Sequence, residues 1–166
     1  MKTYRNILHI FICLFGFGLF AQNQTILGYK AKKHIFEGEV KNKKGRLQAS
    51  GCHHHNATDK QTARIIEKTL KENPTTGVYK AKVEIYDFQT KLWIAKVANG
   101  GYSTFFPKKW TVQETEKAIL EAYKNKTLVS GSSNEYKAYT KEGIEIRMYL
   151  RDDGGIISAF PQDWER

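Results

Sequence analysis

Histidine is the side chain whose unperturbed pKa lies nearest to neutral pH, so histidines are the first candidates for acid–base chemistry in any new sequence. One of the five histidines lies in the apolar N-terminal run, and the other four stand at positions 34, 53, 54 and 55. These four therefore fall within a short part of a chain of 166 residues. Such clustering fits a metal site, an acid–base pair or an exposed basic loop.

The run from Cys52 to His55 offers ligand types that suit zinc. Consecutive side chains on an extended segment point to opposite faces, however, so four adjacent residues cannot close a tetrahedron. Zinc sites use gaps of about two to five residues, and no H-E-x-x-H pattern is present. His34 is the further ligand that such a site would need. We therefore expect no metal site and no other cofactor, with a metal-dependent nuclease using residues 52–55 as the alternative.

Two separated histidines suit the cleavage of RNA by its own 2′-hydroxyl group. One imidazole removes the 2′-OH proton, and one imidazolium protonates the departing 5′-oxygen. A cation then stabilises the negative charge of the transition state, which a lysine can do. Taken singly, each histidine fits a residue without a catalytic role better than a functional one: His34 fits a solvated basic residue, and the run of three fits an exposed loop.

The formal net charge of +10 favours polyanionic partners, namely nucleic acid or an anionic membrane surface. A merely basic secreted protein, or an exported module that binds RNA or glycans without cleaving them, keeps the same charge. The 40% apolar content is ordinary for a globular protein and argues against disorder or a fibre.

Residues 1–21 predict a secretory signal peptide, because a positive start precedes an apolar run that ends near Ala21. We therefore expect a secreted or periplasmic protein, with one folded domain over residues 22–166 and no stable membrane association after processing. Of the two cysteines, Cys13 and Cys52, only Cys52 survives this cleavage, which leaves no intramolecular disulfide.

Hydrophobic periodicity predicts the elements that must position these side chains. We expect helices from residue 58 or 59 to about 73 and over 111–125, the latter with a capping box from Thr111 to Glu114. Alternation predicts strands over 79–85, 92–97, 144–150 and 156–160, with a hairpin turn at 152–155. Period-2 geometry would place Lys96 on one face with Leu92 and Ile94. The order predicts an α+β fold, with helices packed on an antiparallel sheet.

Several blocks of the sequence resemble, in order, the motifs of bacterial EndoU nuclease domains. Residues 33–40 (KHIFEGEV) and 51–54 (GCHH) resemble the paired "H-I-x-x-G-E" and "G-x-H" segments. Residues 93–96 (WIAK) and 103–110 (STFFPKKW) resemble the block "W-x-x-K … S-T-F-F-P-x-x-W". Residues 155–161 (GIISAFP) resemble the closing "I-x-T-A-F-P". The resemblance covers about 33–161, nearly the whole predicted domain, and several motifs in order make it specific.

The resemblance implies a small ribonuclease fold, shared more distantly with RelE-like and barnase-like toxins. It also implies metal-independent cleavage of single-stranded RNA at or near uridine, leaving a 2′,3′-cyclic phosphate. The catalytic residues that the resemblance implies are His34, His53 and Lys96. Without the resemblance, Lys96 would fit a lysine whose aliphatic stem packs along the edge of a core. The partner is then RNA, with tRNA one candidate, and a cognate immunity protein is expected only if the chain is a toxin.

Further residues are assigned to the substrate. Ser158 stands where the family often has threonine and is expected to bind phosphate or base. Phe160 stands where some viral relatives carry a base-stacking tyrosine, and it is expected to contact the substrate. His54 is a further substrate-contact candidate, and a shift of one residue in the motif match would make it the catalytic histidine in place of His53. Lys108 and Lys109 are expected to contact phosphates along the RNA.

Overall fold

The part of the chain that the structure describes, residues 25–162 of a computed structural model, contains three α-helices, one 3₁₀ turn and ten strands. In chain order they are α1 (Tyr29–Phe36), β1 (Glu39–Lys43), β2 (Arg46–Ser50), α2 (Asn56–Asp59), β3 (Ala63–Glu72), β4 (Tyr79–Asp87), β5 (Leu92–Ala95), η1 (Ala98–Gly101), β6 (Tyr102–Phe105), α3 (Val112–Lys124), β7 (Thr127–Leu128), β8 (Glu135–Tyr139), β9 (Glu145–Leu150) and β10 (Ile156–Pro161). The predicted signal peptide, 1–21, lies outside the described residues. Among the described helices, none is long and apolar enough to cross a membrane.

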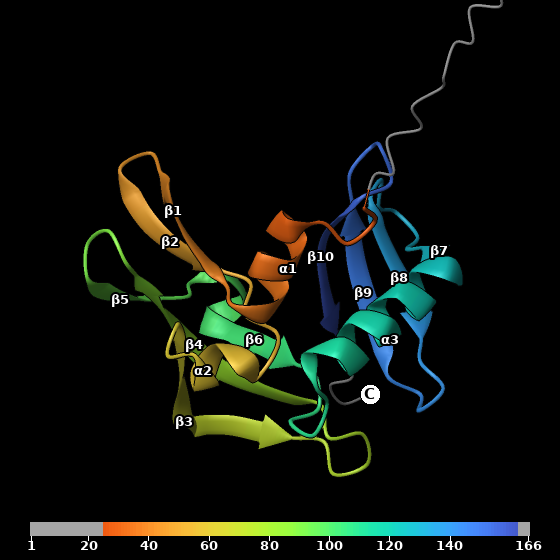
Figure 1. The fold of residues 1–166 in the computed structure, drawn as a ribbon, viewed down its shortest axis with the longest axis horizontal. Helices are drawn as coiled ribbons and strands as arrows, with labels where there is room; N and C mark the ends of the chain where they lie inside the picture. Colours follow the sequence, from red (N-terminus) through yellow and green to blue (C-terminus); the bar gives the residue numbers. More distant parts are fainter. Residues whose placement is uncertain (1–24, 163–166) are drawn as a thin grey trace, which may run out of the picture.

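The strands form three antiparallel sheets, which confirms the predicted α+β class. The first is the hairpin of β1 and β2, and the second has the order β3-β4-β5, with β6 also paired to β4. The third has the order β10-β9-β8-β7. Figure 1 shows α1 between the two larger sheets and α3 lying across the third.

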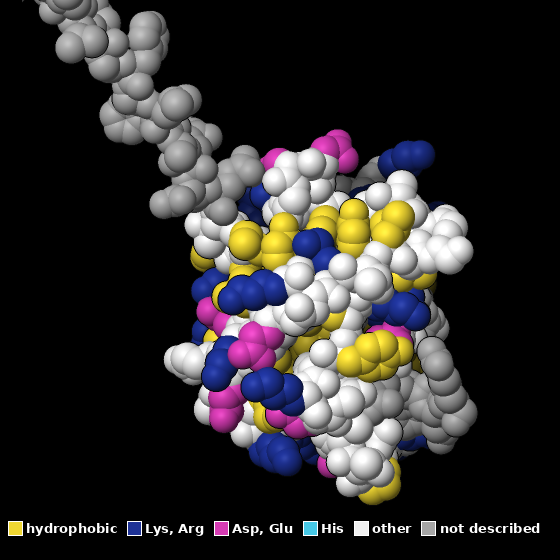
Figure 2. Space-filling model, turned by 90° about the vertical axis from the view of Figure 1, so that its right-hand side faces the viewer, with side chains coloured by type: hydrophobic (Ala, Val, Ile, Leu, Met, Phe, Trp, Pro, Cys, Tyr) yellow, Lys and Arg dark blue, Asp and Glu magenta, His cyan; other side chains and the backbone are white. Residues whose placement is uncertain are grey.

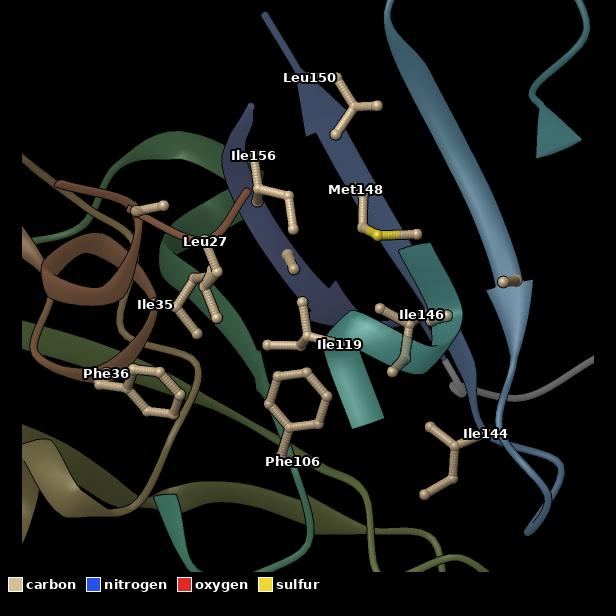
Figure 3. Packing of buried hydrophobic residues seen from close by; sticks show 14 of the residues in the cluster. Leu27, Ile35, Phe36, Phe106, Ile119, Ile144, Ile146, Met148, Leu150 and Ile156 are labelled. Carbon is tan, nitrogen blue, oxygen red and sulfur yellow. The ribbon is translucent and has the colours of Figure 1, made fainter. Parts of the chain in front are cut away.

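The third sheet carries the main hydrophobic core on the face that α1 and α3 cover. Ile146, Met148 and Leu150 alternate along β9 and are buried, as the sequence predicts. Ile35 of α1 and Ile119 of α3 point into the same interior (Figure 3). The predicted capping box of α3 is present, so this helix begins where the sequence indicates. Burial of these side chains is the main favourable term for this half of the fold.

The other face of the third sheet is polar and aromatic. Directly paired residues share a face of an antiparallel sheet. The register pairs Phe160 with Arg147 and pairs Tyr149 with both Ser158 and Glu135. These side chains therefore lie together on the face opposite the core. They form one wall of the candidate site.

The predicted helix from residue 58 or 59 to 73 is wrong. The helix α2 ends at Asp59, and residues 63–72 form β3, which pairs antiparallel with β4. The i, i+3, i+4 spacing of apolar residues suggested a helix, but the adjacent β-branched Ile65 and Ile66 fit a pleated surface better. Pairing also satisfies backbone groups along the edge of β4, which a helix here would leave unpaired.

Two local features differ from the sequence analysis as well. The helix α1 was not predicted, because only Ala31, Ile35 and Phe36 bury apolar side chains on an otherwise basic segment. The expected alternation also does not reach Lys96. Strand β5 ends at Ala95, and Lys96 is 8% exposed whereas Leu92 is 57% exposed.

Gly51 allows the closest backbone approach near the histidines, and its replacement tests the fold. Its φ is +76°, and an added Cβ would lie 2.1 Å from the carbonyl oxygen of His34. Gly45 has a φ of +78° but nothing within 4 Å of an added Cβ, so it serves as the matched control. We expect Gly45→Ala to cost about 1–2 kcal/mol of backbone strain. Gly51→Ala should cost about 3 kcal/mol or more, because a clash adds to the strain. The free energy of unfolding in urea measures both, and equal losses would contradict the packing described here.

Candidate active site

Three segments that are distant in sequence bring His34 and His53 together. The two ring centroids lie 6.2 Å apart. His34 lies in the last turn of α1, and His53 lies in the loop between β2 and α2. Backbone hydrogen bonds run from Cys52 N–H to His34 C=O (2.9 Å), from His53 N–H to Ile35 C=O (2.7 Å) and from Phe106 N–H to His53 C=O (2.9 Å). The loop is thus fixed between α1 and the end of β6.

Glu39 orients the imidazole of His34. Its carboxylate accepts a hydrogen bond from His34 Nδ1–H at 2.8 Å, and Lys41 Nζ lies 2.7 Å from the same oxygen. Burial lowers the pKa of His34, and the Glu39 carboxylate opposes that shift. Burial also raises the pKa of Glu39, but hydrogen bonds from Lys41 and His34 outweigh it, so the carboxylate stays charged at neutral pH. This arrangement leaves Nε2 of His34 to face a substrate.

A neutral carbonyl orients His53. Its Nδ1–H donates to the backbone oxygen of Thr104 at 2.8 Å, and its ring stacks on Phe160 with centroids 5.2 Å apart. Burial, and next the charge of Lys96, lower the pKa of His53 well below its usual value. His53 is therefore neutral at rest, and its Nε2 carries the lone pair.

Lys96 places a buried cation close to both rings. Its ammonium donates to Ser103 Oγ at 2.7 Å and approaches the carbonyl oxygen of Gly51 at 3.4 Å. Ser103 in turn donates to that carbonyl at 2.9 Å. Burial lowers the pKa of Lys96 to about 8. Because these partners are a hydroxyl and a carbonyl and carry no negative charge, the ammonium remains available to an anion.

The run from Cys52 to His55 does not converge on a common point. His54 donates from Nε2 to Trp110 C=O at 3.1 Å and accepts at Nδ1 from Asn56 N–H at 3.0 Å. His55 lies 3.4 Å from the carboxylate of Asp59. Burial raises the pKa of Cys52 to about 12, which disfavours the thiolate that binds metals. These four residues do not fit a shared metal ion, and no other metal-ligating group of three His, Cys, Asp or Glu occurs in residues 25–162.

The remaining substrate candidates divide into two groups. Phe160 touches the centre directly through His53, and Ser158 is buried two residues earlier on the same face of β10. Lys108 and Lys109 are exposed in the turn after β6, where the ammonium of Lys108 lies 5.2 Å from the centroid of the Tyr79 ring. Both ring nitrogens of His54 are engaged within the fold, so a substrate contact from this side chain would need to break a hydrogen bond.

Three further residues hold the centre in place, and none of them was predicted from the sequence. Glu39, Ser103 and Thr104 all stand inside the blocks that resemble the EndoU motifs. The motif match alone gave them no role, because their contacts with His34, Lys96 and His53 depend on tertiary structure. The position of Glu39, a carboxylate five residues after a candidate histidine, was the one usable signal.

A groove of about 410 Å³ opens beside the centre. One end contains Phe160, Ser103 and Thr104, which contact His53 and Lys96. The groove continues between β6 and the polar face of the third sheet, where it is lined by Lys80, Asn99, Tyr102, Glu135, Arg147, Tyr149 and Gln162. Figure 2 shows the side of the molecule on the right of Figure 1, and no histidine side chain is visible on it.

The depressed pKa of Lys96 predicts that its charge destabilises the fold at neutral pH. The folded chain releases this proton near pH 8, whereas the unfolded chain retains it to about 10.5, so stability rises across that window. Lys96→Met removes the buried charge but also one hydrogen bond. The net effect should be to raise the free energy of unfolding at pH 7 by about 1–2 kcal/mol. The advantage should shrink toward pH 10. Urea denaturation at both pH values measures it, with the exposed Lys124→Met as control. A variant that is less stable by the same amount at both pH values would contradict this.

Comparison with known proteins identifies a family for this chain. Residues 28–163 match the family described as Bacterial EndoU nuclease. The chain is also 40% identical over 131 residues to a protein named "Toxin" from Bacillus cereus strain ATCC 14579. The matched region covers 79% of this chain but 22% of that protein, so the chain spans about a fifth of its relative's length. No solved structure matches significantly. The family match covers about four fifths of the chain, and the chain therefore belongs to the bacterial EndoU nuclease family.

Proposed function

We propose that the chain is a metal-independent endoribonuclease that cleaves single-stranded RNA through the 2′-hydroxyl and leaves a 2′,3′-cyclic phosphate. The observation that carries the proposal is the meeting of His34 and His53 beside the buried cation of Lys96. Each imidazole is held through Nδ1, so both Nε2 atoms are left for the substrate. Two proton-transfer groups and one cation are what this transesterification needs.

We propose roles for the two histidines from their hydrogen-bond partners. His53 faces a neutral carbonyl and the charge of Lys96, which both fit a histidine that starts neutral and acts as the general base. Burial lowers the pKa of His34, but the Glu39 carboxylate opposes that shift and stabilises the imidazolium that a general acid requires. His53 Nε2 takes the 2′-OH proton, the 2′-oxygen attacks phosphorus, and the 5′-oxygen leaves with the proton of His34 Nε2. Lys96 stabilises the non-bridging oxygens as their negative charge grows.

The groove beside Phe160 supports a nucleotide-binding role on one side of the cleaved bond. Phe160 and Tyr149 offer aromatic surface, with ring centroids 6.1 Å apart. Arg147 lies on the same wall, where it is paired with Glu135 and Glu145. Aromatic stacking and a nearby cation are typical of single-stranded nucleic acid sites. Ser158 adds a hydroxyl on that face. The preference for uridine is part of the proposal and rests on the family resemblance.

We also propose that the chain is an exported toxin. The protein with which it shares 40% identity is named "Toxin", and residues 1–21 have the composition of a secretory signal peptide. A cell that makes such a nuclease then needs a cognate immunity protein. Co-expression with genes that neighbour its own, scored by growth of the host, tests this part separately from the chemistry.

Cleavage in the presence of a chelator tests the chemistry. Residues 22–166 are incubated with a uridine-containing RNA, with and without EDTA. We expect the same rate in both, and a 2′,3′-cyclic phosphate at the new end. Loss of cleavage in EDTA with recovery in zinc would instead support a metal-dependent nuclease. Binding without cleavage would support a binding module.

Substitution of the adjacent histidines separates catalysis from structure. We expect His53→Ala to lower kcat by roughly 10²–10⁴-fold, because it removes one proton-transfer group. His34→Ala should lose activity to a similar extent. His54→Ala should instead lower the free energy of unfolding, because the carbonyl of Trp110 and the amide of Asn56 lose their partner. Steady-state kinetics and thermal unfolding of all three variants give the answer. A severe kinetic loss in His54→Ala with His53→Ala near wild type would reverse the assignment.

A further inference from the structure

The hairpin of β1 and β2 carries a dense group of exposed cations. Lys41, Lys43, Lys44 and Arg46 are all exposed, and residues 40–50 contain no Asp or Glu. Figure 1 shows the hairpin standing out from the rest of the described chain, on the side opposite α3. Lys41 is paired with Glu39, but Lys43, Lys44 and Arg46 form no ion pair within residues 25–162. A projecting element with such positive charge attracts polyanions.

Register places most of this charge on one face of the hairpin. Lys43 is paired with Arg46, and Lys41 is paired with Gln48. Alternation along β1 puts Glu39 on that same face. Because Glu39 holds the imidazole of His34, the charged face begins at the catalytic centre and runs outward.

A hollow of about 340 Å³ lies along this face next to Lys96. Lys41, Lys43 and Gln48 form one side, and Val97 and Ala98 form the other. Ser50, which precedes Gly51, lines its inner end. The hollow therefore starts where Gly51 and Lys96 meet, on the hairpin side of Lys96. It is distinct from the groove at Phe160, which is lined by Ser103 and Thr104.

We propose that this face of the hairpin binds the phosphate backbone of the single-stranded RNA that flanks the cleaved bond. This inference rests on the proposed ribonuclease function. From Glu39 to Lys43 the strand rises about 13 Å. At roughly 3.4 Å or more per nucleotide, that length spans two to four phosphates. Lysine and arginine contacts to phosphate add affinity that depends on salt and carries no base specificity.

Paired substitutions test the proposal on substrates of two lengths. Lys43→Gln with Arg46→Gln removes two hairpin charges and keeps Lys41, which contacts Glu39. Lys117→Gln with Lys124→Gln removes two exposed charges from α3 as the matched control. Each protein is assayed on a dinucleotide and on a 12-nucleotide single-stranded RNA with one uridine. Affinity for a 12-mer with a non-cleavable 2′-deoxyuridine is measured across a salt series.

The hairpin variant should cleave the dinucleotide at the wild-type rate. On the 12-mer its kcat/KM should fall on the order of tenfold at low salt, and the slope of log affinity against log salt should flatten by about 1.4 for two lost contacts. Each single substitution should give about half of that change in slope. The control should match wild type on both substrates.

Other outcomes overturn one proposal or the other. If the wild type cleaves neither substrate, the ribonuclease function fails. If it cleaves both and the hairpin variant behaves like the control on the 12-mer, the hairpin does not bind RNA. An equal loss on both substrates would mean that the hairpin acts only through the catalytic centre. Lost binding to phosphatidylglycerol vesicles, with RNA affinity unchanged, would assign the charge to a membrane surface instead. Equal midpoints of urea unfolding for all variants would show that the differences in cleavage and binding do not come from a loss of folded protein.

Discussion

The loop from Gly51 to His54 is held by backbone hydrogen bonds on two sides, and the candidate site depends on this connection. Amide groups of Cys52 and His53 bond to the last turn of α1, and the carbonyl of His53 bonds to Phe106. An added Cβ at Gly51 would overlap the carbonyl of His34, so only glycine permits the approach. The carbonyl group of Gly51 itself faces Lys96 and Ser103. One short segment thus sets the positions of both histidines and of the lysine.

The electrostatics of the site oppose stability and favour chemistry. A buried ammonium that meets only a hydroxyl and a carbonyl keeps an unfavourable desolvation energy. A carboxylate partner would relieve that cost but would also neutralise the charge and repel an RNA phosphate. The nearest carboxylate of the site, Glu39, is instead directed at His34. In the proposed mechanism, this separation leaves the ammonium of Lys96 for the transition state and the carboxylate of Glu39 for the proton transfer by His34.

Much of the fold could be predicted from local sequence patterns, and the errors have physical causes. The capped helix α3 and the alternating β9 were predicted correctly, because their signals are strong and local. Strand β3 was mistaken for a helix, since its state depends on pairing with β4 rather than on its own spacing. The motifs identified the family, and the structure brings His34, His53 and Lys96 together. Glu39, Ser103 and the carbonyl of Thr104 could not be assigned, because nothing in a linear sequence reports which groups face them.

The central claim is that this centre directs the attack of the RNA's own 2′-hydroxyl, and a chimeric substrate tests it most directly. A single-stranded RNA with one uridine is compared with the same strand carrying 2′-deoxyuridine at that position, with wild-type protein and equal binding verified. The arrangement of His34, His53 and Lys96 predicts cleavage of the first strand at the uridine and complete resistance of the second at that bond. Cleavage of the deoxy-substituted bond at a comparable rate would require a water nucleophile and would contradict the mechanism.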